Sequence, residues 1–275
     1  MILFIRKTAR ENARQTERQT ARPTARQTAR HVFGLAALSL QIAGTSAWAQ
    51  SSCSSDGKKP PTALVERFIS ADCDTCWADP ATPRVRPGEL ALDWIVPSAK
   101  GDDAPLSAAA SRDAVTRLQA LRMDAPRNAA TTRHNIATPS STKAPTLRVA
   151  HGVALGGYMG TSIELKPAKG AALPRQPLTA WLLLVEEVPA GTDGTPVARN
   201  LIRNTILSTW NIDKLLLKSD QDYIQRSTTL PRLYESRPMS IPAGANPDHL
   251  RVVGWVEDAK GRVIASAASV CVELK

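Results

Sequence analysis

The 275-residue sequence has few aromatic residues, only four cysteines and four histidines, and no long apolar run. Phe, Trp and Tyr make up 4% of the chain, but the hydrophobic share is still 43%, which is typical of a folded protein and not of a disordered one. The apolar run at 32–44 is shorter than the ~20 residues that cross a bilayer, so we expect no membrane span. Scattered histidines (His134, His151 and His249) and the lack of a second close cysteine pair make zinc the weakest interpretation. We therefore predict no metal and no cofactor.

The positive charge is concentrated at the N-terminus. The formal net charge is +10, and residues 1–49 supply +6 of it through eight Lys or Arg and two Glu. The remaining +4 is spread over 27 basic and 23 acidic residues. Such a weak, diffuse charge predicts no nucleic-acid partner.

Residues 1–49 have the layout of an export signal. A basic segment ends near Arg30, the apolar run follows, and Ala47-Trp48-Ala49 supplies the small-x-small pattern that signal peptidase cuts. We expect Gln50 to begin a periplasmic or secreted protein without a lipid anchor, because no cysteine stands at the cleavage point. The basic segment repeats a Thr-Ala-Arg unit, which is typical either of low-complexity sequence or of an arginine-rich arm or transit peptide.

The mature chain changes composition part-way along. Beyond a polar linker at 50–61, the expected elements of the front half are strands at 63–69 and 90–96, an amphipathic helix over 106–122 and a polar loop over 124–145. The back half shows seven strand candidates, at 147–153, 162–166, 178–188, 198–208, 223–229, 249–257 and 262–274. We therefore predict an α+β protein with one domain over 62–145 and an antiparallel β-sandwich domain over 146–275.

The four cysteines are expected to form disulfides if the protein is exported, and they allow three pairings. Cys73 and Cys76 are too close in sequence to join distant parts of the chain. If these two pair together, Cys53 and Cys271 remain near the two ends of the mature chain. A lone thiol on the polar face of the last strand would be a liability, so we favour a structural Cys53–Cys271 bridge.

The sequence Cys73-Asp74-Thr75-Cys76 follows an apolar strand, which is the setting of redox motifs. In thiol–disulfide exchange one thiol attacks as a thiolate, and a second must lie near enough to resolve the mixed disulfide. We assign Cys73 as the attacking thiol and Cys76 as the resolving thiol, with an unknown protein thiol or disulfide as partner. Asp72 and Asp74 flank Cys73, and their negative charge disfavours the thiolate. A purely structural bridge explains the same residues, and both interpretations stay open.

The segment 64–76 (LVERFISADCDTC) resembles the opening of a family of secreted thioredoxin-like proteins known as domain of unknown function 1223. That family's motif runs roughly V-E-L-F-T-S-x-G-C-S-x-C-P, and the matching residues are Val65, Glu66, Phe68, Ser70, Cys73 and Cys76. Segments 200–203 and 254–258 are similar to C-terminal strands of the same group. The resemblance implies a thioredoxin-like front half and a β-rich back half, and it brings no established activity.

The chain departs from this family at several positions. Asp72 replaces the motif's glycine, Trp77 replaces its proline, and the family's histidine before Asp93 and Trp94 is absent. We interpret Asp93 and Trp94 as packing or turn residues. Three prolines within 77–89 leave room for at most a turn or two of helix after the cysteines. The resemblance therefore implies a degenerate thioredoxin-like domain.

Two functions follow from these features. The first is an exported thiol–disulfide oxidoreductase whose catalytic residues are Cys73 and Cys76. The alternative is a non-enzymatic binding or scaffold protein of the cell envelope, in which both bridges are structural. Three tryptophans are expected in the core, or in a docking surface under the alternative: Trp181, Trp210 and Trp255.

Overall fold

The computed structural model describes residues 53–136, 144–211 and 232–271, which belong to one compact unit. The expected export signal and the strand expected at 223–229 lie outside the described residues. Among the helices of the described part, none has the length and apolar character needed to cross a membrane.

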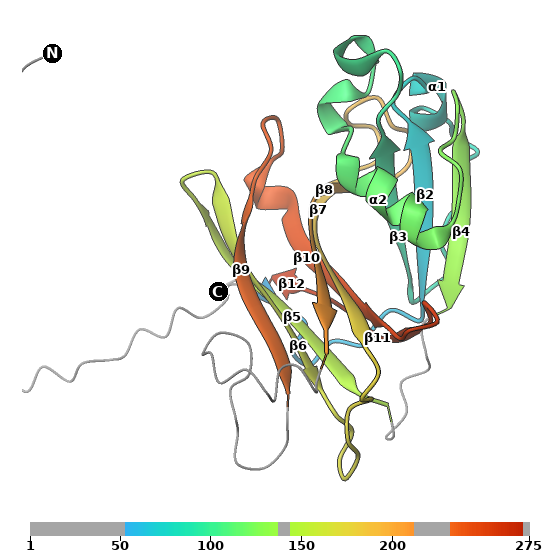
Figure 1. Ribbon diagram of the computed structural model, residues 1–275. Coiled ribbons are helices and arrows are strands. Elements are labelled where there is room, and N and C mark those ends of the chain that lie inside the picture. Colours follow the sequence, from blue (N-terminus) through green and yellow to red (C-terminus); the bar gives the residue numbers. More distant parts are fainter. Residues whose placement is uncertain (1–52, 137–143, 212–231, 272–275) are drawn as a thin grey trace, which may run out of the picture. The chain divides into compact units, whose positions relative to one another are not determined.

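The described chain is built mainly of strands (Figure 1). The strands are β1 (Cys53–Ser54), β2 (Ala63–Ser70), β3 (Glu89–Val96), β4 (Ala130–Ile136), β5 (Thr146–Leu155), β6 (Tyr158–Lys166), β7 (Leu178–Val188), β8 (Arg199–Trp210), β9 (Leu233–Ser240), β10 (Leu250–Glu257), β11 (Val263–Ala268) and β12 (Val270–Cys271). The α-helices are α1 (Asp74–Trp77) and α2 (Arg112–Leu121), and short 3-10 turns are η1 (Gly101–Asp103), η2 (Ser107–Ala109) and η3 (Pro247–His249).

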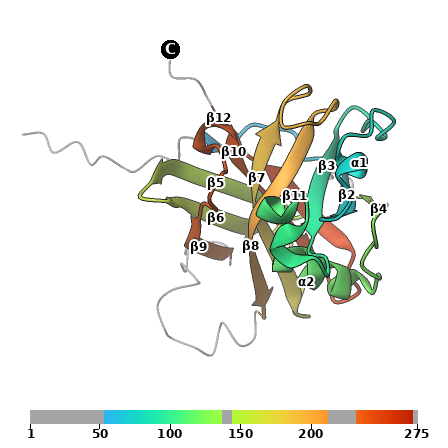
Figure 2. The same ribbon diagram turned by 90° about the horizontal axis from the view of Figure 1, so that it is seen from above.

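The strands form two sheets whose strands cross in the view of Figure 2. The five-stranded sheet has the order β12-β1-β5-β6-β9, with every neighbouring pair antiparallel. The seven-stranded sheet has the order β11-β10-β7-β8-β3-β2-β4, and within it β3 is parallel to both β2 and β8. The fold is therefore β-sandwich-like.

The predicted α+β class with a thioredoxin-like N-terminal domain is wrong. β2, β3 and β4 do not form a sheet of their own; they continue the seven-stranded sheet, whose other four strands come from beyond residue 145. The helix at the cysteines is only the four residues of α1, which include Cys76, and Pro80, Pro83 and Pro87 follow it closely. The front half thus supplies three strands at one end of the larger sheet, with β4 at its edge, and one covering helix.

Two further elements of the front half differ from expectation. α2 is shorter than the helix expected over 106–122: the Ser111 side chain caps its start by accepting the Asp113 N–H at 3.0 Å, and Arg122 ends it in the left-handed conformation. The loop expected over 124–145 contains β4, which pairs antiparallel with β2. Its sequence, ATTRHNI, lacks the apolar alternation that marks a half-buried strand, and β4 is an edge strand.

The seven-stranded sheet is buried on both faces. Alternate residues of β7 illustrate this: Leu182 and Leu184 join the core shared with the five-stranded sheet, whereas Trp181 and Leu183 join the core that includes residues of α2. On β10, a Cβ at Gly254 would lie 2.8 Å from Val149 of the opposite sheet, so the close approach of the sheets requires glycine there. The expectation that Trp181, Trp210 and Trp255 lie in the core is confirmed, since each is 5% exposed or less.

A buried ion cluster lies within the core under α2. Arg117 is 1% exposed and donates to both carboxylate oxygens of Glu66, at 2.7 and 2.8 Å, and to Glu257 at 2.8 Å. Its guanidinium also lies over the rings of Trp181 and Trp255, at 4.8 and 5.0 Å from their centroids. Arg117 lies three residues after Ala114 and therefore shares the buried face of α2. It is buried because the sheet presents two carboxylates to it.

Candidate functional site

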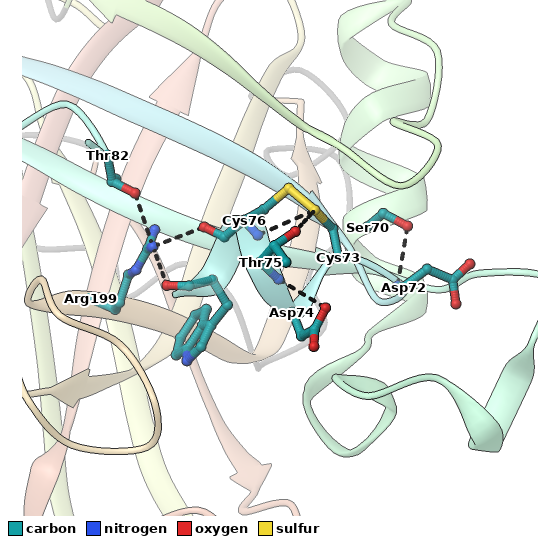
Figure 3. The surroundings of a disulfide bond; sticks show 9 residues. Ser70, Asp72, Cys73, Asp74, Thr75, Cys76, Thr82 and Arg199 are labelled. Carbon is teal, nitrogen blue, oxygen red and sulfur yellow. Dashed lines mark hydrogen bonds between the residues drawn. A yellow bond between two sulfur atoms is a disulfide. The ribbon is translucent and has the colours of Figure 1, made fainter. Parts of the chain in front are cut away.

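The two cysteines of the C-x-x-C motif lie where β2 gives way to α1 (Figure 3). β2 is buried along its whole length and ends at Ser70, whose carbonyl accepts the N–H of Cys73 at 2.9 Å. Cys73 then occupies the N-cap position of α1, and one turn later Cys76 completes a disulfide with it, with the Cα atoms 5.2 Å apart. The end of a buried strand thus fixes one cysteine, and the helical turn brings the second one to it.

The two cysteines differ in accessibility. Cys73 is 3% exposed and belongs to a core cluster with Ile69, Ile95 and Leu201, whereas Cys76 is only partly buried. The sulfur of Cys73 accepts the backbone N–H of Cys76 at 3.3 Å. The Thr75 hydroxyl also lies 3.5 Å from that sulfur. The buried sulfur therefore has polar neighbours suited to a negative charge.

The acidic residues beside Cys73 are themselves engaged. The Asp72 carboxylate points away from the disulfide in Figure 3; it accepts the Ser98 hydroxyl at 2.9 Å and lies 3.5 Å from the ammonium of Lys100. Asp74 is exposed and accepts the N–H of Thr75 at 2.9 Å. The lysine partly offsets the negative charge of Asp72. The negative charge of Asp74 should therefore have the larger electrostatic effect on the cysteines.

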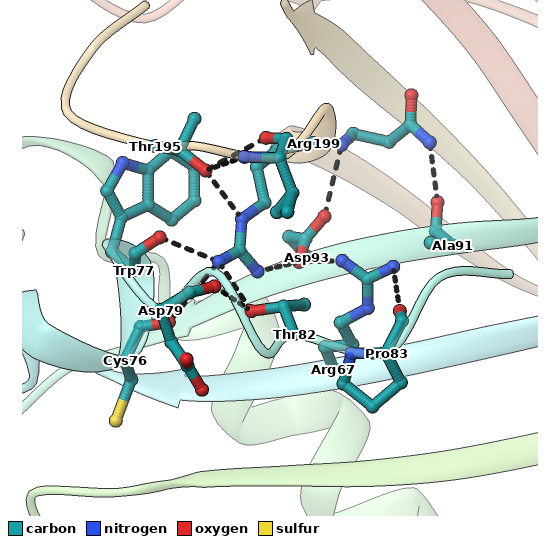
Figure 4. Close-up of polar contacts among 12 residues, drawn as sticks. Arg67, Cys76, Trp77, Asp79, Thr82, Pro83, Ala91, Asp93, Thr195 and Arg199 are labelled. Atoms are coloured by element: carbon teal, nitrogen blue, oxygen red, sulfur yellow. Dashed lines mark hydrogen bonds and ion pairs between the residues drawn. The ribbon is translucent and has the colours of Figure 1, made fainter. Parts of the chain in front are cut away.

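Arg199, at the start of β8, holds the C-terminal end of α1 (Figure 4). It is 2% exposed, and its Nη2 donates to the carbonyl of Cys76 at 3.2 Å and to that of Trp77 at 2.7 Å. The guanidinium lies 5.0 Å from the centre of the Trp77 ring. The indole N–H of Trp77 donates to the carbonyl of Asp193, in the loop between β7 and β8, at 2.8 Å. A cation on the last carbonyls of a helical turn stabilises that turn.

Asp93 connects this arginine to a second one. Its carboxylate is completely buried and lies 3.2 Å from Nη1 of Arg199 and 3.3 Å from Nη1 of Arg67. Its other oxygen accepts the N–H of Asn200 at 3.0 Å. Two arginines on one aspartate give this cluster a formal charge of +1. Trp94 is a fully buried packing residue, as expected, whereas Asp93 is buried as the ion-pair partner of two arginines and not by packing alone.

Beside α1 the surface is hollowed. This depression is lined by Ala78 and Pro80 after the helix and by Gly191, Gly194, Thr195 and Pro196 of the β7–β8 loop. Its walls are mostly small residues and prolines.

The predicted Cys53–Cys271 bridge is confirmed. The disulfide joins β1 and β12, which pair antiparallel with Cys53 opposite Cys271. β5 lies on the other side of β1 and places His151 opposite Cys53. One ring nitrogen of His151 and the two sulfurs lie within 4.8 Å of one another. Sequence reasoning missed this grouping because strand register, not spacing along the chain, brings the three residues together.

The other histidines lie elsewhere. His249 is exposed at the end of η3, and His134 belongs to β4, where its side chain is not described. The glycines of the β5–β6 region form a tight turn at Gly156 and Gly157, both with positive φ. No chemistry converges on that turn among the described residues.

Comparison with known proteins identifies no family. No family model matches the sequence, and no curated protein matches it. Among solved structures the chain is similar to HBP35 of Porphyromonas gingivalis, with a TM-score of 0.44 and 12% sequence identity. The match covers 79% of this chain and 77% of that one. The resemblance to domain of unknown function 1223 stays a prediction.

Proposed function

We propose that this protein is an exported thiol–disulfide oxidoreductase of the periplasm or the cell exterior, with Cys73 and Cys76 as its redox pair. One observation carries the proposal: a disulfide between residues three apart joins a buried cysteine to a partly exposed one on a framework fixed by buried contacts. Two disulfides in one chain are typical of oxidising compartments, which supports export.

The difference in burial favours attack on Cys76. An incoming thiolate forms a bond to the sulfur of Cys76, the Cys73–Cys76 bond breaks, and Cys73 leaves as a thiolate. That thiolate would keep the Cys76 N–H and the Thr75 hydroxyl as donors. A second thiol of the partner then attacks the partner's sulfur in the mixed disulfide, so that the partner leaves as a disulfide and Cys76 leaves as a thiolate, with both cysteines reduced. In the opposite direction Cys76 attacks a disulfide of the partner, and Cys73 attacks Cys76, restores the enzyme disulfide and releases the partner as a dithiol. This order exchanges the two roles expected from the sequence.

A purely structural role suits this disulfide less well. In the chain-entropy model, a bridge between residues three apart stabilises the fold by only about 2 kcal/mol, because it closes a very short loop. The turn is also held by other means, since Arg199 binds the carbonyls of Cys76 and Trp77. The bridge therefore adds little to a turn that is already anchored.

A non-enzymatic binding protein of the cell envelope is the second candidate, and a different region favours it. The β5–β6 hairpin ends in apolar side chains that are largely exposed: Val153 at 72%, Leu155 at 80% and Tyr158 at 55%. Exposed apolar side chains clustered at a hairpin tip are typical of an interaction site.

The redox proposal is tested by equilibrating the purified protein in glutathione buffers of graded potential. Alkylation and mass spectrometry then report the state of each cysteine. We expect the Cys73–Cys76 pair to open and close reversibly while Cys53–Cys271 stays closed. In an insulin-reduction assay, Cys76→Ser should abolish turnover, and Cys73→Ser should trap a mixed disulfide on Cys76.

The matched control is the Cys53→Ser/Cys271→Ser variant, which should keep its activity in that assay if it folds. If Cys76→Ser reduces insulin as well as the unaltered protein, the oxidoreductase proposal fails. A binding protein would instead retain its partner in the Cys73→Ser/Cys76→Ser variant and lose it when Leu155 is changed to Asp.

A further inference from the structure

Three residues with metal-binding side chains lie side by side across three strands of the five-stranded sheet. The order β12-β1-β5 places Cys271 opposite Cys53, and Cys53 opposite His151. Their ligand atoms, two sulfurs and one ring nitrogen, lie within 4.8 Å of one another. Cys53 is 4% exposed and His151 is 3% exposed, while Cys271 is exposed and opens the group to solvent.

The imidazole of His151 is arranged as a ligand would be. Its Nδ1 lies 2.9 Å from the carbonyl oxygen of Gly152, so Nδ1 is the nitrogen that carries the proton. Nε2 then holds a lone pair, and it has no hydrogen-bond partner among the described residues. Metal-binding histidines are oriented in this way, with one nitrogen donating to a backbone carbonyl. A buried ring nitrogen without a partner is unusual and calls for an explanation.

Burial also keeps this ring neutral. Loss of hydration lowers the pKa of His151 below its ordinary value of 6.5, and the contact with Gly152 only partly opposes this. The neutral form, which alone can bind a metal, is therefore retained at a lower pH than in an exposed histidine.

We propose that reduction of the Cys53–Cys271 disulfide opens a zinc site, in which the two thiolates and the imidazole of His151 bind Zn²⁺. Tetrahedral zinc with bonds of ≈2.3 Å to sulfur and ≈2.0–2.1 Å to nitrogen needs ligand atoms about 3.5–4 Å apart. One ring nitrogen of His151 and the two sulfurs already lie within 4.8 Å of one another, and breaking the disulfide lets the sulfurs separate to that spacing. Three protein ligands leave the fourth position to water.

The reaction balances with a dithiol as the reductant. The dithiol supplies two electrons and two protons, becomes a disulfide, and converts the Cys53–Cys271 bond to two thiols. Zn²⁺ then displaces the two thiol protons. Because disulfide sulfurs are not thiolate ligands, the bridge and the ion exclude each other. Zinc should therefore make this disulfide easier to reduce, and reoxidation should release the ion.

The experiment uses the full chain with Cys73→Ser and Cys76→Ser, so that the only thiols are those of the proposed site. After reduction with a phosphine and its removal, zinc affinity is measured by competition with a coloured chelator. Co²⁺ is added to a second sample to record thiolate-to-cobalt charge transfer and tetrahedral d–d bands. We expect one ion per reduced chain and none in the oxidised chain.

Two further variants in the same background test whether zinc binds to all three residues of the site or to the two thiols alone. His151→Ala should weaken zinc binding by about tenfold or more, since even outer-shell changes at metal sites cost that much. His249→Ala, which changes an exposed histidine of η3, should leave the affinity unchanged. Bound zinc should also protect Cys53 and Cys271 from alkylation.

Thermal unfolding distinguishes zinc binding by the folded protein from zinc binding by thiols of an unfolded chain. Zinc should raise the melting temperature of the reduced chain and leave that of the oxidised chain unchanged. The proposal is overturned if the reduced chain takes up no zinc, if His151→Ala binds zinc equally well, or if zinc fails to raise the melting temperature. The background lacks the Cys73–Cys76 pair, so these outcomes are independent of the proposed redox function.

Discussion

The two disulfides of this chain differ in almost every property that decides what a disulfide does. Cys53–Cys271 joins residues 218 apart in sequence and ties the first and last strands of the described chain together. Cys73–Cys76 joins residues three apart within one turn. In the chain-entropy model the first bridge removes much more conformational freedom from the unfolded chain than the second, because it closes a far longer loop.

The surroundings of the two bridges differ as well. Cys53–Cys271 lies on a sheet beside a neutral, buried imidazole. Cys73–Cys76 lies at a strand end, between the acidic Asp74 and the cationic cluster around Asp93. This contrast supports the proposal that the long bridge stabilises the fold while the short bridge exchanges electrons, and the following variants test it.

The largest expected effect comes from removing the long bridge. Cys53→Ser/Cys271→Ser should lower the free energy of unfolding by about 4–5 kcal/mol, whereas Cys73→Ser/Cys76→Ser should lower it by about 2 kcal/mol. Urea denaturation of both variants under non-reducing conditions measures this difference. Equal losses in the two variants would contradict the assignment of stabilisation to the long bridge.

Next in size is the change Arg199→Met. It removes a buried cation from Asp93 and from the carbonyls of α1, and it should cost about 3 kcal/mol of folding free energy. It should also shift the reduction potential of Cys73–Cys76 and leave that of Cys53–Cys271 unchanged, as measured in glutathione buffers. Arg203→Met is the control on the same strand, because Arg203 pairs with Glu186. A shift of both potentials in Arg199→Met would indicate general destabilisation instead of positioning.

A smaller effect is expected from Asp74→Asn. Removing this exposed carboxylate should favour the thiolate beside it and speed alkylation of the reduced pair by about two- to fivefold at neutral pH. The gain should shrink at high ionic strength, since exposed charges are screened. Asp102→Asn, at an exposed position in η1, should leave the rate unchanged. An equal acceleration in both variants would show that net charge, not position, is responsible.

The smallest effect concerns the pH dependence of stability near the long bridge. Burial lowers the pKa of His151 from 6.5, so below that pH the unfolded chain binds a proton that the folded chain does not. Stability should therefore fall as the pH drops below about 6.5, down to the lowered pKa of the folded state. Thermal melts of the unaltered protein and of His151→Gln across this range measure the difference, and the variant should lose less stability. Parallel curves would contradict a buried, neutral His151.

The sequence pattern predicts the apolar strands well and the edge strands poorly. β7 and β10 are nearly continuous apolar runs because both of their faces are buried, and such runs are easy to recognise. β4 and β9 are rich in polar residues, and β9 contains Pro238. Both are edge strands, where proline and polar side chains are tolerated, so neither carries a recognisable pattern.

The candidate sites were predictable only in part. The short spacing of Cys73 and Cys76 is local, so the sequence identifies that pair directly. Arg199 reaches the same turn from a strand more than a hundred residues away, and nothing in its sequence neighbourhood reveals this. Glu66 and Arg67 interrupt an apolar run in the sequence, yet both are buried because Arg117 and Asp93 neutralise them. Ion pairs between residues far apart in sequence produce no hydrophobic periodicity that the sequence could show.

β3 and β8 run parallel in the seven-stranded sheet, but their backbones pair over a very short stretch. Backbone pairing there is confined to Asp93 and Leu201. Two hydrogen bonds support it: the Asn200 side chain donates to the carbonyl of Ala91, and the Asn200 backbone N–H donates to the Asp93 carboxylate. The turn that holds Cys73 and Cys76 follows β2, on the β3 side of this junction. Arg199 binds the turn from β8, on the other side. Because Arg199 binds the backbone carbonyls of Cys76 and Trp77 and not the sulfur atoms, the turn should stay attached to β8 whether the two cysteines are bonded or reduced.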